Sequence, residues 1–315
     1  MTADRPVFAA GLLSASMFLM SFVDNLVRVV SDDITVWQFH AIRALFALPM
    51  IALGALLIRG ATLRQRRPFW VCVRATCMAI AMLFFFASIP MLPMAQATAG
   101  LFTAPLFVLS FAVLFLGEPV GWRRVCAVLV GFGGLLVILQ PFRSEIEWLS
   151  LLPVVAGAFY AVCVIITRQR CREESPFALI FANFSAFGLM GIGGAAILTL
   201  WPASSAQIDA APFIFSGWSM PSWDVFAVMS GLALGAVFGV GGMTRAYQLA
   251  DSSFLTLFDY THLIGASIFA YFLWSEVPPP EAMLGVVMIV GAGVYLTLRG
   301  RDTGAVPGPL GRSSA

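Results

Sequence analysis

The chain has 315 residues, of which 60% are hydrophobic and only 11% are charged, and its mean hydropathy is +0.92. A soluble domain is about a quarter charged, so this composition excludes a soluble globular protein and requires a lipid bilayer. The net charge is +2, and Arg supplies all 18 basic residues because the chain contains no Lys. This balance gives no sign of a nucleic-acid partner.

Apolar segments of about 20 residues, the length that crosses the hydrocarbon layer, follow one another along the chain. The first ends in Asp24-Asn25 without a small-residue cleavage site, which predicts an uncleaved helix. All eight Trp lie at segment ends or in a loop, as expected of an interfacial belt. The ten predicted transmembrane helices are 7–29, 37–58, 69–89, 95–116, 123–140, 149–167, 177–200, 223–246, 252–274 and 281–299.

The segment 95–139 recurs 158 residues later as 253–297. In the second copy the basic pair Arg123-Arg124 is replaced by Glu281-Ala282. Since Arg is retained on the cytoplasmic side of membranes, the two copies are predicted to have opposite orientations. Inverted repeats of apolar helices are typical of secondary transporters, which bind substrate between the halves. The matched residue pairs are Thr98 with Thr256, Thr103 with Thr261, Phe111 with Phe269, Glu118 with Glu276 and Gly133 with Gly291.

The distribution of Arg predicts the orientation of the whole chain. Alternate loops are rich in Arg, most clearly 59–67 and 168–172, whereas the opposite side holds only Arg143 and Arg28 near a helix end. Both termini are therefore predicted to be cytoplasmic. The predicted organisation is an all-α membrane protein of ten helices in a five-plus-five inverted repeat. Its parts are a first repeat at 1–147, a second at 148–300 and a disordered tail at 301–315.

Short motifs in both repeats resemble a known family. In the first repeat they are Met94-Ala-Gln-Ala-Thr-Ala-Gly-Leu-Phe-Thr-Ala-Pro105 and Leu116-Gly-Glu-Pro-Val-Gly-Trp-Arg-Arg124. In the second they are Arg245-Ala-Tyr-Gln-Leu-Ala250, Phe258-Asp-Tyr-Thr-His262 and Ser275-Glu-Val-Pro278. Together they resemble the EamA-type carriers of the drug/metabolite transporter superfamily, over roughly residues 8–299.

The resemblance implies a ten-helix carrier that works without ATP hydrolysis. It implies a central cavity lined mainly by predicted helices 1, 3, 4, 6, 8 and 9. Carriers similar to this chain move amino acids, nucleosides, S-adenosylmethionine, riboflavin or other metabolites, some inward and some outward. The resemblance therefore indicates the class of transporter and leaves its cargo and its direction of transport open.

Charged groups inside apolar helices are the main functional clues, because each is costly unless it is paired or hydrated. Asp259 is placed roughly 10 Å into the apolar layer by helical rise, followed by Tyr260 and His262. His262 stands at i+3 and can share a face with Asp259. The pair is either a substrate or proton site, or a structural ion pair to which Arg245 contributes.

Other polar groups near predicted helix ends allow more than one interpretation. Asp24 and Arg28 are four residues apart, which suits an intrahelical pair that reaches the interface, and Asn25 lies beside them. Arg43 is expected to clamp helices or gate the outer side. Arg74 is expected to snorkel toward the cytoplasmic interface.

Several further positions complete the candidate site. Gln96, Phe102 and Thr103 precede a kink expected at Pro105, and Tyr160 gives predicted helix 6 a polar group at its middle. The candidate substrate-binding residues are Phe102, Thr103, Tyr160, Asp259, Tyr260, His262, Gln96, Asp24 and Asn25. The candidate gating or structural residues are Arg28, Arg43, Arg74 and Arg245.

Two sets of residues are expected to be structural. The spacing of Gly231, Gly235, Gly239 and Gly242 predicts close helix packing. Glu118 and Glu276 are each expected to bind backbone groups at the start of the following helix. The five Cys have no metal-ligand spacing and are expected to pack as small apolar groups, without disulfides.

These features predict a secondary transporter of a small organic metabolite. Neither a cofactor nor a metal is indicated. A phosphate loop of the Walker type requires Lys, and the usual motifs of hydrolases and metalloproteases are missing from the sequence. An intramembrane enzyme built on Asp259 and His262, and a non-transporting receptor, are the alternatives. Proton coupling and homodimerisation are left open.

Overall fold

The structure is a computed structural model that describes residues 6–104, 106–107, 110–111, 122–139, 151–171, 173–249 and 258–300. These residues form helices and loops and contain no strand, so the predicted all-α class is confirmed. Five helical stretches are long and apolar enough to cross a membrane, and shorter apolar helices accompany them. The expected kink residue Pro105, Glu118 and the predicted disordered tail lie outside the described residues.

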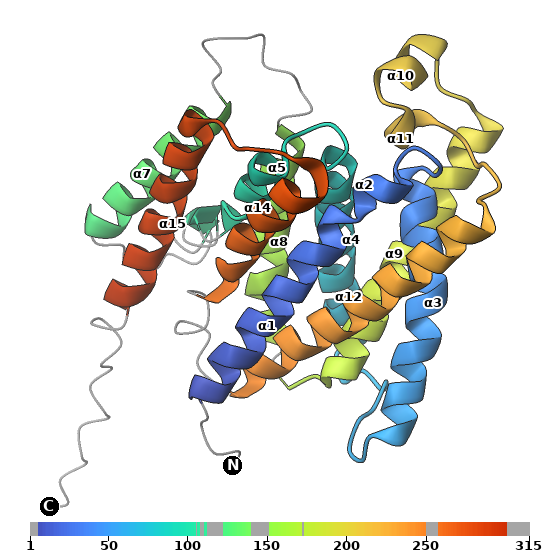
Figure 1. The fold of residues 1–315 in the computed structure, drawn as a ribbon. Coiled ribbons are helices and arrows are strands. Elements are labelled where there is room, and N and C mark those ends of the chain that lie inside the picture. The colour runs from blue at the N-terminus through green and yellow to red at the C-terminus, as the bar shows by residue number, and fades with distance from the viewer. Residues whose placement is uncertain are drawn as a thin grey trace, which may run out of the picture.

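The described helices coincide with the predicted spans (Figure 1). The first five spans correspond to α1 (Pro6–Asn25) with α2 (Val27–Val30), α3 (Val36–Leu57), α4 (Pro68–Ser88), α5 (Met94–Leu101) and α7 (Trp122–Leu139). The last five correspond to α8 (Leu152–Arg170), α9 (Pro176–Leu200), α12 (Trp223–Leu249), α14 (Thr261–Trp274) and α15 (Pro280–Gly300). Two short helices that the sequence did not predict, α10 (Ser205–Ala210) and α11 (Pro212–Phe215), lie in the loop before α12.

Local sequence signals explain where the helices start. Thr35 and Gln38 form a capping box in front of α3, in which each side chain bonds the backbone of the other residue. Proline stands in the first turn of α4, α8 and α9, where the missing N–H has no partner to lose. The apolar sequences that follow supply the packing and lipid-facing surfaces.

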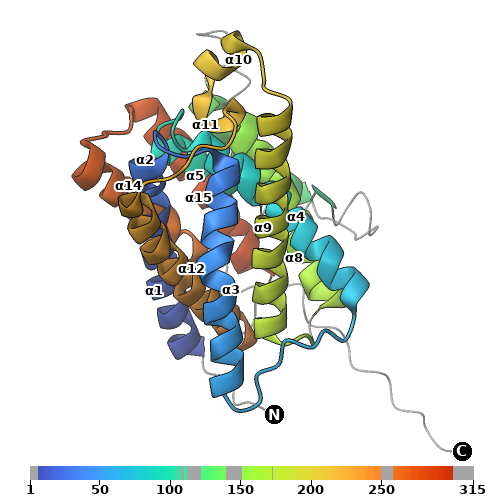
Figure 2. The same ribbon diagram turned by 90° about the vertical axis from the view of Figure 1, so that its right-hand side faces the viewer.

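Helix contacts follow a pseudo-twofold pattern. The pairs α1–α12, α1–α14 and α3–α12 have counterparts in α8–α4, α8–α5 and α9–α4. The pairs α3–α9, α7–α15 and α5–α14 join each helix to its own repeat partner. Figure 1 and Figure 2 show α1 and α8 running in opposite directions. This is the arrangement expected of a five-plus-five inverted repeat.

The glycine stripe of α12 packs against α1, as predicted. A Cβ added at Gly235 would stand 2.6 Å from Val23, and one at Gly239 would stand 2.6 Å from Met20. A Cβ at Gly242 would overlap the Ser16 hydroxyl, whereas Gly231 meets nothing within 4 Å. Three of the four glycines therefore permit the close approach of α12 to α1.

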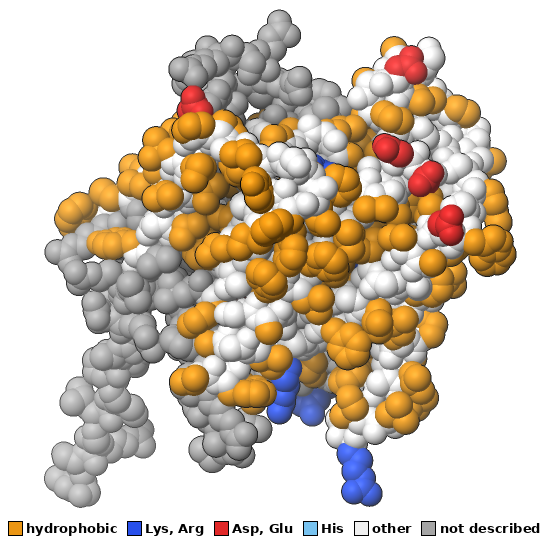
Figure 3. Space-filling model, in the orientation of Figure 1, with side chains coloured by type: hydrophobic (Ala, Val, Ile, Leu, Met, Phe, Trp, Pro, Cys, Tyr) orange, Lys and Arg blue, Asp and Glu red, His pale blue; other side chains and the backbone are white. Residues whose placement is uncertain are grey.

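Charge is segregated between the two ends of the helix bundle. Figure 3 shows acidic side chains at the end that carries α10 and basic side chains at the opposite end, with a broad apolar band between them. The acidic end holds Asp209 of α10, Asp224 of α12 and Glu281 of α15. The segment 59–67 joins α3 to α4 at the basic end. The end that carries α10 is called the acidic end below.

Candidate functional site

The fourth and ninth predicted helices are each interrupted at the same repeat position. Helix α5 ends at Leu101, and Phe102 and Thr103 form a turn before the chain becomes helical again at Ala104. In the second repeat Phe258 and Asp259 are helical, Tyr260 forms a turn, and α14 begins at Thr261. Phe102 and Tyr260 are exact counterparts at the 158-residue offset. The sequence predicted a kink in the first repeat and missed the one in the second.

Pro105 accounts for the first interruption. A proline has no N–H to donate to the carbonyl four residues earlier, and its ring crowds that carbonyl, which here belongs to Leu101. The Thr103 hydroxyl instead donates to the Gly100 carbonyl over 2.6 Å. Thr103 is fully buried, and its hydroxyl oxygen would lie 2.8 Å from a Cβ added at Gly157 of α8. Thr103 therefore stabilises the turn and its packing on α8.

The two interruptions face each other across the pseudo-twofold axis. The Phe102 and Tyr260 rings have centroids 5.9 Å apart, and the Phe102 and His262 rings are 5.5 Å apart. Discontinuous helices near the middle of a membrane commonly form the substrate sites of transporters. The predicted residues Phe102, Tyr260 and His262 are thus brought together, and the name paired interruptions is used below for the turns at Phe102–Thr103 and at Tyr260.

His262 pairs with helix α1 and not with Asp259. Its Nε2 lies 2.9 Å from Oδ2 of Asp24, and both side chains are 5% exposed. Asp24 Oδ1 and His262 Nδ1 are buried without a hydrogen-bond partner among the described residues. His262 was expected to pair with Asp259. It instead contacts Asp24 on α1, which lies 238 residues away in the sequence.

Asp259 is half-buried one turn before His262. Its carboxylate acts electrostatically on the hydroxyl groups of Tyr260 and of Tyr160 on α8. Tyr160 packs against a core cluster formed mainly by α3, α4, α9 and α12. Asp259 and Tyr160, both of the second repeat, are therefore close enough to interact electrostatically, and both were predicted to line a central cavity.

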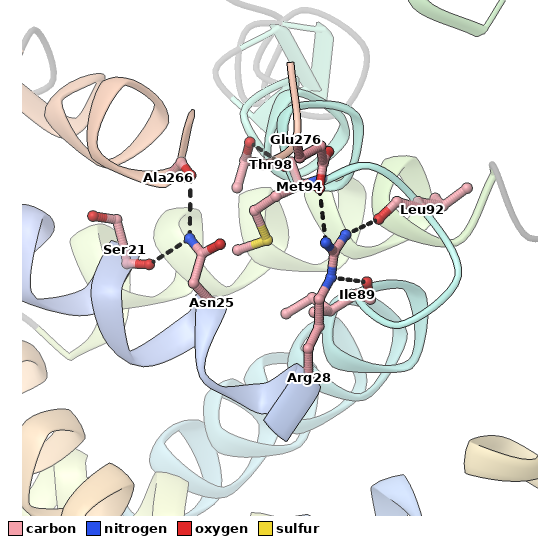
Figure 4. Close-up of polar contacts among 9 residues, drawn as sticks. All are labelled: Ser21, Asn25, Arg28, Ile89, Leu92, Met94, Thr98, Ala266 and Glu276. Carbon is pink, nitrogen blue, oxygen red and sulfur yellow. Dashed lines mark hydrogen bonds and ion pairs between the residues drawn. The ribbon is translucent and has the colours of Figure 1, made fainter. Parts of the chain in front are cut away.

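Arg28 joins four segments at the acidic end of the bundle (Figure 4). Its guanidinium donates to Glu276 Oε2 over 2.7 Å, to the Ile89 carbonyl over 3.1 Å and to the Leu92 carbonyl over 2.6 Å. The other Glu276 oxygen accepts from the Met94 N–H over 2.7 Å, at the N-terminus of α5. These contacts, called the Arg28–Glu276 cluster below, use all three guanidinium nitrogens and both carboxylate oxygens.

The cluster corrects two expectations. Arg28 does not pair with Asp24, because the helix is interrupted at Leu26 and the i,i+4 register is lost between α1 and α2. Glu276 binds an N-terminal N–H as expected of a carboxylate, but the helix is α5 and not the following α15. Ser275 ends α14 in the left-handed conformation, with φ of 53°, and so directs Glu276 back toward α5.

Asn25 connects α1 to α14 beside this cluster. Its side-chain nitrogen donates to the Ser21 carbonyl over 2.9 Å and to the Ala266 carbonyl over 3.2 Å (Figure 4). Its Oδ1 is buried without a hydrogen-bond partner among the described residues. Asn25 thus links α1 to α14 through a hydrogen bond, and its Oδ1 is an unused acceptor beside Asp24 in the sequence.

Arg43 and His40 form an aromatic-walled group on α3. The Arg43 guanidinium carbon lies 5.4 Å from the Phe39 ring centroid and 5.1 Å from that of Phe86 on α4, and Arg43 acts electrostatically on Asp24. The His40 ring is fully buried, with the rings of Phe39, Phe86 and Phe187 within 5.5 Å. This geometry agrees with the expected helix clamp at Arg43.

Arg74 does not snorkel to the interface. It is 9% exposed, and it donates to Thr167 of α8 over 2.6 Å and to Asn183 of α9 over 2.9 Å. The expectation was wrong because the partners lie on other helices, where they satisfy the guanidinium inside the bundle. Asn183 was overlooked, although a lone amide within an apolar span is itself a signal of such a contact.

The two remaining candidates, Gln96 and Arg245, lie on α5 and α12. Gln96 is half-buried in the first turn of α5, and Arg245 is exposed near the end of α12. Cys163 and Cys171 are buried, as expected of small packing groups, whereas Cys72 and Cys126 are exposed on their helices. All five Cys are free thiols.

Comparison with known proteins identifies the chain. Residues 7–140 match the EamA-like transporter family. The chain is an EamA-type member of the drug/metabolite transporter superfamily. This EamA-type protein is a transporter and not an enzyme, and its apolar helices make it a multi-pass bacterial membrane protein. A solved crystal structure of 16% identity superimposes with a TM-score of 0.64, covering 94% of this chain and 99% of that chain, which supports the fold.

Its curated relatives differ in cargo. An S-adenosylmethionine uptake transporter of Rickettsia felis is 25% identical over 90% of this chain and 92% of its own length. A riboflavin transporter of Brucella anthropi is 28% identical, with 85% and 88% covered. A pseudopaline exporter of Pseudomonas aeruginosa is 24% identical, with 91% and 96% covered. Both uptake and export thus occur among proteins similar to this one.

Proposed function

We propose that this EamA-type transporter carries a metabolite with a flat heterocyclic ring, bound at the paired interruptions, by alternating access. The observation that carries the proposal is the pair of rings at equivalent interrupted positions, Phe102 and Tyr260, with centroids 5.9 Å apart. Aromatic side chains bind planar rings through stacking and edge contacts. The names of two relatives, for S-adenosylmethionine and riboflavin, both denote cargos with such a ring.

Polar groups beside the rings support binding of the rest of such a molecule. Asp259 directly precedes Tyr260 and acts electrostatically on the hydroxyls of Tyr260 and Tyr160, so these groups offer hydrogen bonds and negative charge to a bound molecule. A mostly apolar site with a few convergent polar groups is the usual form of a small-molecule site. Asp24, Asn25, Gln96 and Thr103 remain in the proposed lining, with Asn25 and Thr103 shaping it through the backbone bonds described above.

We place the acidic end of the bundle outside the cell and the Arg-rich loops and both termini in the cytoplasm. The support is the retention of Arg on cytoplasmic sides, together with the segregation of charge between the ends. Single cysteines introduced at Arg64 and at Ser205 in a cysteine-free background test this orientation. Labelling of whole cells by an impermeant maleimide at Ser205 and not at Arg64 is expected, and the reverse pattern would contradict it.

The cargo proposal is tested by flux in proteoliposomes. Radiolabelled S-adenosylmethionine and riboflavin are offered to vesicles with the purified protein, with protein-free vesicles as control and an amino-acid mixture as competitor. Saturable accumulation or counterflow of either ring-bearing probe is expected. Transport of amino acids with no flux of either probe would contradict the proposed cargo class and leave the transporter assignment in place.

A further inference from the structure

The Asp24–His262 pair is a buried polar contact that is only partly satisfied in the described part of the bundle. The two side chains share one bond of 2.9 Å, while Asp24 Oδ1 and His262 Nδ1 are sealed from the surface and have no hydrogen-bond partner among the described residues. An unsatisfied buried polar atom costs about 1–3 kcal/mol, so a native protein that keeps two of them in one pair calls for an explanation.

We infer that the Asp24–His262 pair binds the proton that accompanies transport. This inference rests on the proposed function, because it assigns the coupling ion of the same carrier. It places the site on α1 and α14, which differs from the sequence expectation of coupling at Asp259.

The protonation step follows from the geometry. With an ionised Asp24, His262 donates its Nε2–H to Oδ2, so the lone pair of Nδ1 is left unused. A proton from water adds to Nδ1 and gives an imidazolium that is paired with the carboxylate. The same N–H bond breaks when the proton returns to water on the other side. The pair changes its net charge from −1 to 0, and no electrons are transferred.

The surroundings of the pair supply the coupling. Because Nδ1 and Oδ1 are sealed in this conformation, the proton can enter or leave only after α1 or α14 moves. The His262 ring also contacts the Phe102 ring of the proposed cargo site at 5.5 Å. Cargo that displaces Phe102 would therefore alter the access of water to His262. Such a link between cargo binding and proton access is required if cargo and proton are to cross the membrane together.

Two arginines on the neighbouring segments already make other contacts. Arg28 is bound by Glu276, and Arg43 is held against Phe39 and Phe86 while it acts electrostatically on Asp24. The neighbours of α1 on α12 are the glycines of the stripe described above. The charged or titratable groups on the neighbouring segments are Arg28 of α2, His40 and Arg43 of α3, Asp224 and Arg245 near the ends of α12, and Asp259 and Tyr260 before α14.

The presence of only two His in the chain permits a test that needs no cargo. The full-length protein, labelled with ¹⁵N-histidine in lipid nanodiscs, is titrated by NMR from about pH 8 to pH 5, the range in which imidazoles change charge. His40→Phe assigns the two ring signals. We expect His262 to convert to the doubly protonated form, and Asp24→Asn to prevent the conversion in this range. A His262 ring that stays neutral in the native protein would overturn the inference.

The coupling is tested by flux driven by a pH gradient, with S-adenosylmethionine and riboflavin as probes. Asp24→Asn and His262→Gln are expected to lose at least 90% of the gradient-driven component, expressed as a fraction of each variant's own exchange at equal pH. Asp224→Asn, which changes an exposed carboxylate of α12, is the matched control and should respond as the native protein does. A retained gradient response in both pair variants, or its loss in Asp259→Asn alone, would overturn the inference. If neither probe moves, the proposed cargo class fails and the NMR titration decides the proton site.

Discussion

Two ion pairs link the first helix region to the ninth, and they differ in how completely they are satisfied. The Arg28–Glu276 cluster uses every guanidinium nitrogen and both carboxylate oxygens, and it draws together α2, α5, the α4–α5 loop and the end of α14. The Asp24–His262 pair has one bond and two buried atoms without partners in the described structure. A saturated pair resists change, whereas an unsaturated one can accept a proton at little structural cost.

The largest effect expected from this difference is on the saturated cluster. Arg28→Ala should lower the free energy of unfolding by about 3 kcal/mol, because it leaves the Glu276 carboxylate and two backbone carbonyls without their donor. Arg28→Lys keeps the charge, but its ammonium group cannot reach three acceptors in fixed geometry. Its loss of unfolding free energy is therefore expected to lie between zero and that of Arg28→Ala. Thermal unfolding in detergent measures both. A loss below 1 kcal/mol for Arg28→Ala would mean that the cluster does not hold the acidic end together.

A smaller effect is expected at the unsaturated pair. Asp24→Asn should cost about 1 kcal/mol of stability, since the amide can still hydrogen-bond His262 and only the electrostatic interaction with Arg43 is lost. The measurement is the same unfolding experiment, made in parallel with Arg28→Ala. If Asp24→Asn destabilised the protein as much as Arg28→Ala does, Asp24 would be a structural residue and the contrast between the two pairs would disappear.

The smallest effect concerns the residue that positions Glu276. Ser275 adopts a left-handed conformation, which costs a non-glycine residue about 1–2 kcal/mol. Ser275→Gly should therefore raise the free energy of unfolding by up to about 1 kcal/mol, after the greater flexibility of glycine in the unfolded chain is subtracted. Ser275→Ala is the control and should give no gain. The repeat counterpart of Ser275 is Gly117, which has the residue type suited to such a turn.

The sequence predicted the features that depend on local pattern. Hydropathy placed the spans, and for eight of the ten both described ends agree within three residues. The glycine spacing of α12 correctly indicated close packing, because small residues at every fourth position form one face of a helix. The repeat and its charge reversal likewise predicted the inverted architecture that the mirrored helix contacts display.

The sequence could not identify partners that are distant along the chain. His262 was assigned to Asp259, three residues away, whereas its partner Asp24 is 238 residues away. Arg28 was assigned to Asp24 because the interruption at Leu26 has no proline or glycine to announce it. In each case an acceptable neighbour in sequence was available, and tertiary packing selected a different residue. The paired interruptions were half predicted, since only the first repeat contains a proline.

Counterflow kinetics at the paired interruptions test the central claim most directly. Vesicles containing the native protein, Phe102→Ala or Tyr260→Ala are preloaded with unlabelled cargo, and entry of labelled S-adenosylmethionine or riboflavin is followed over a range of concentrations. Loss of one aromatic contact worth about 1.4 kcal/mol should raise the half-saturating concentration about tenfold in each variant at normal protein levels. Unchanged half-saturation in both variants would contradict a cargo site between these two rings.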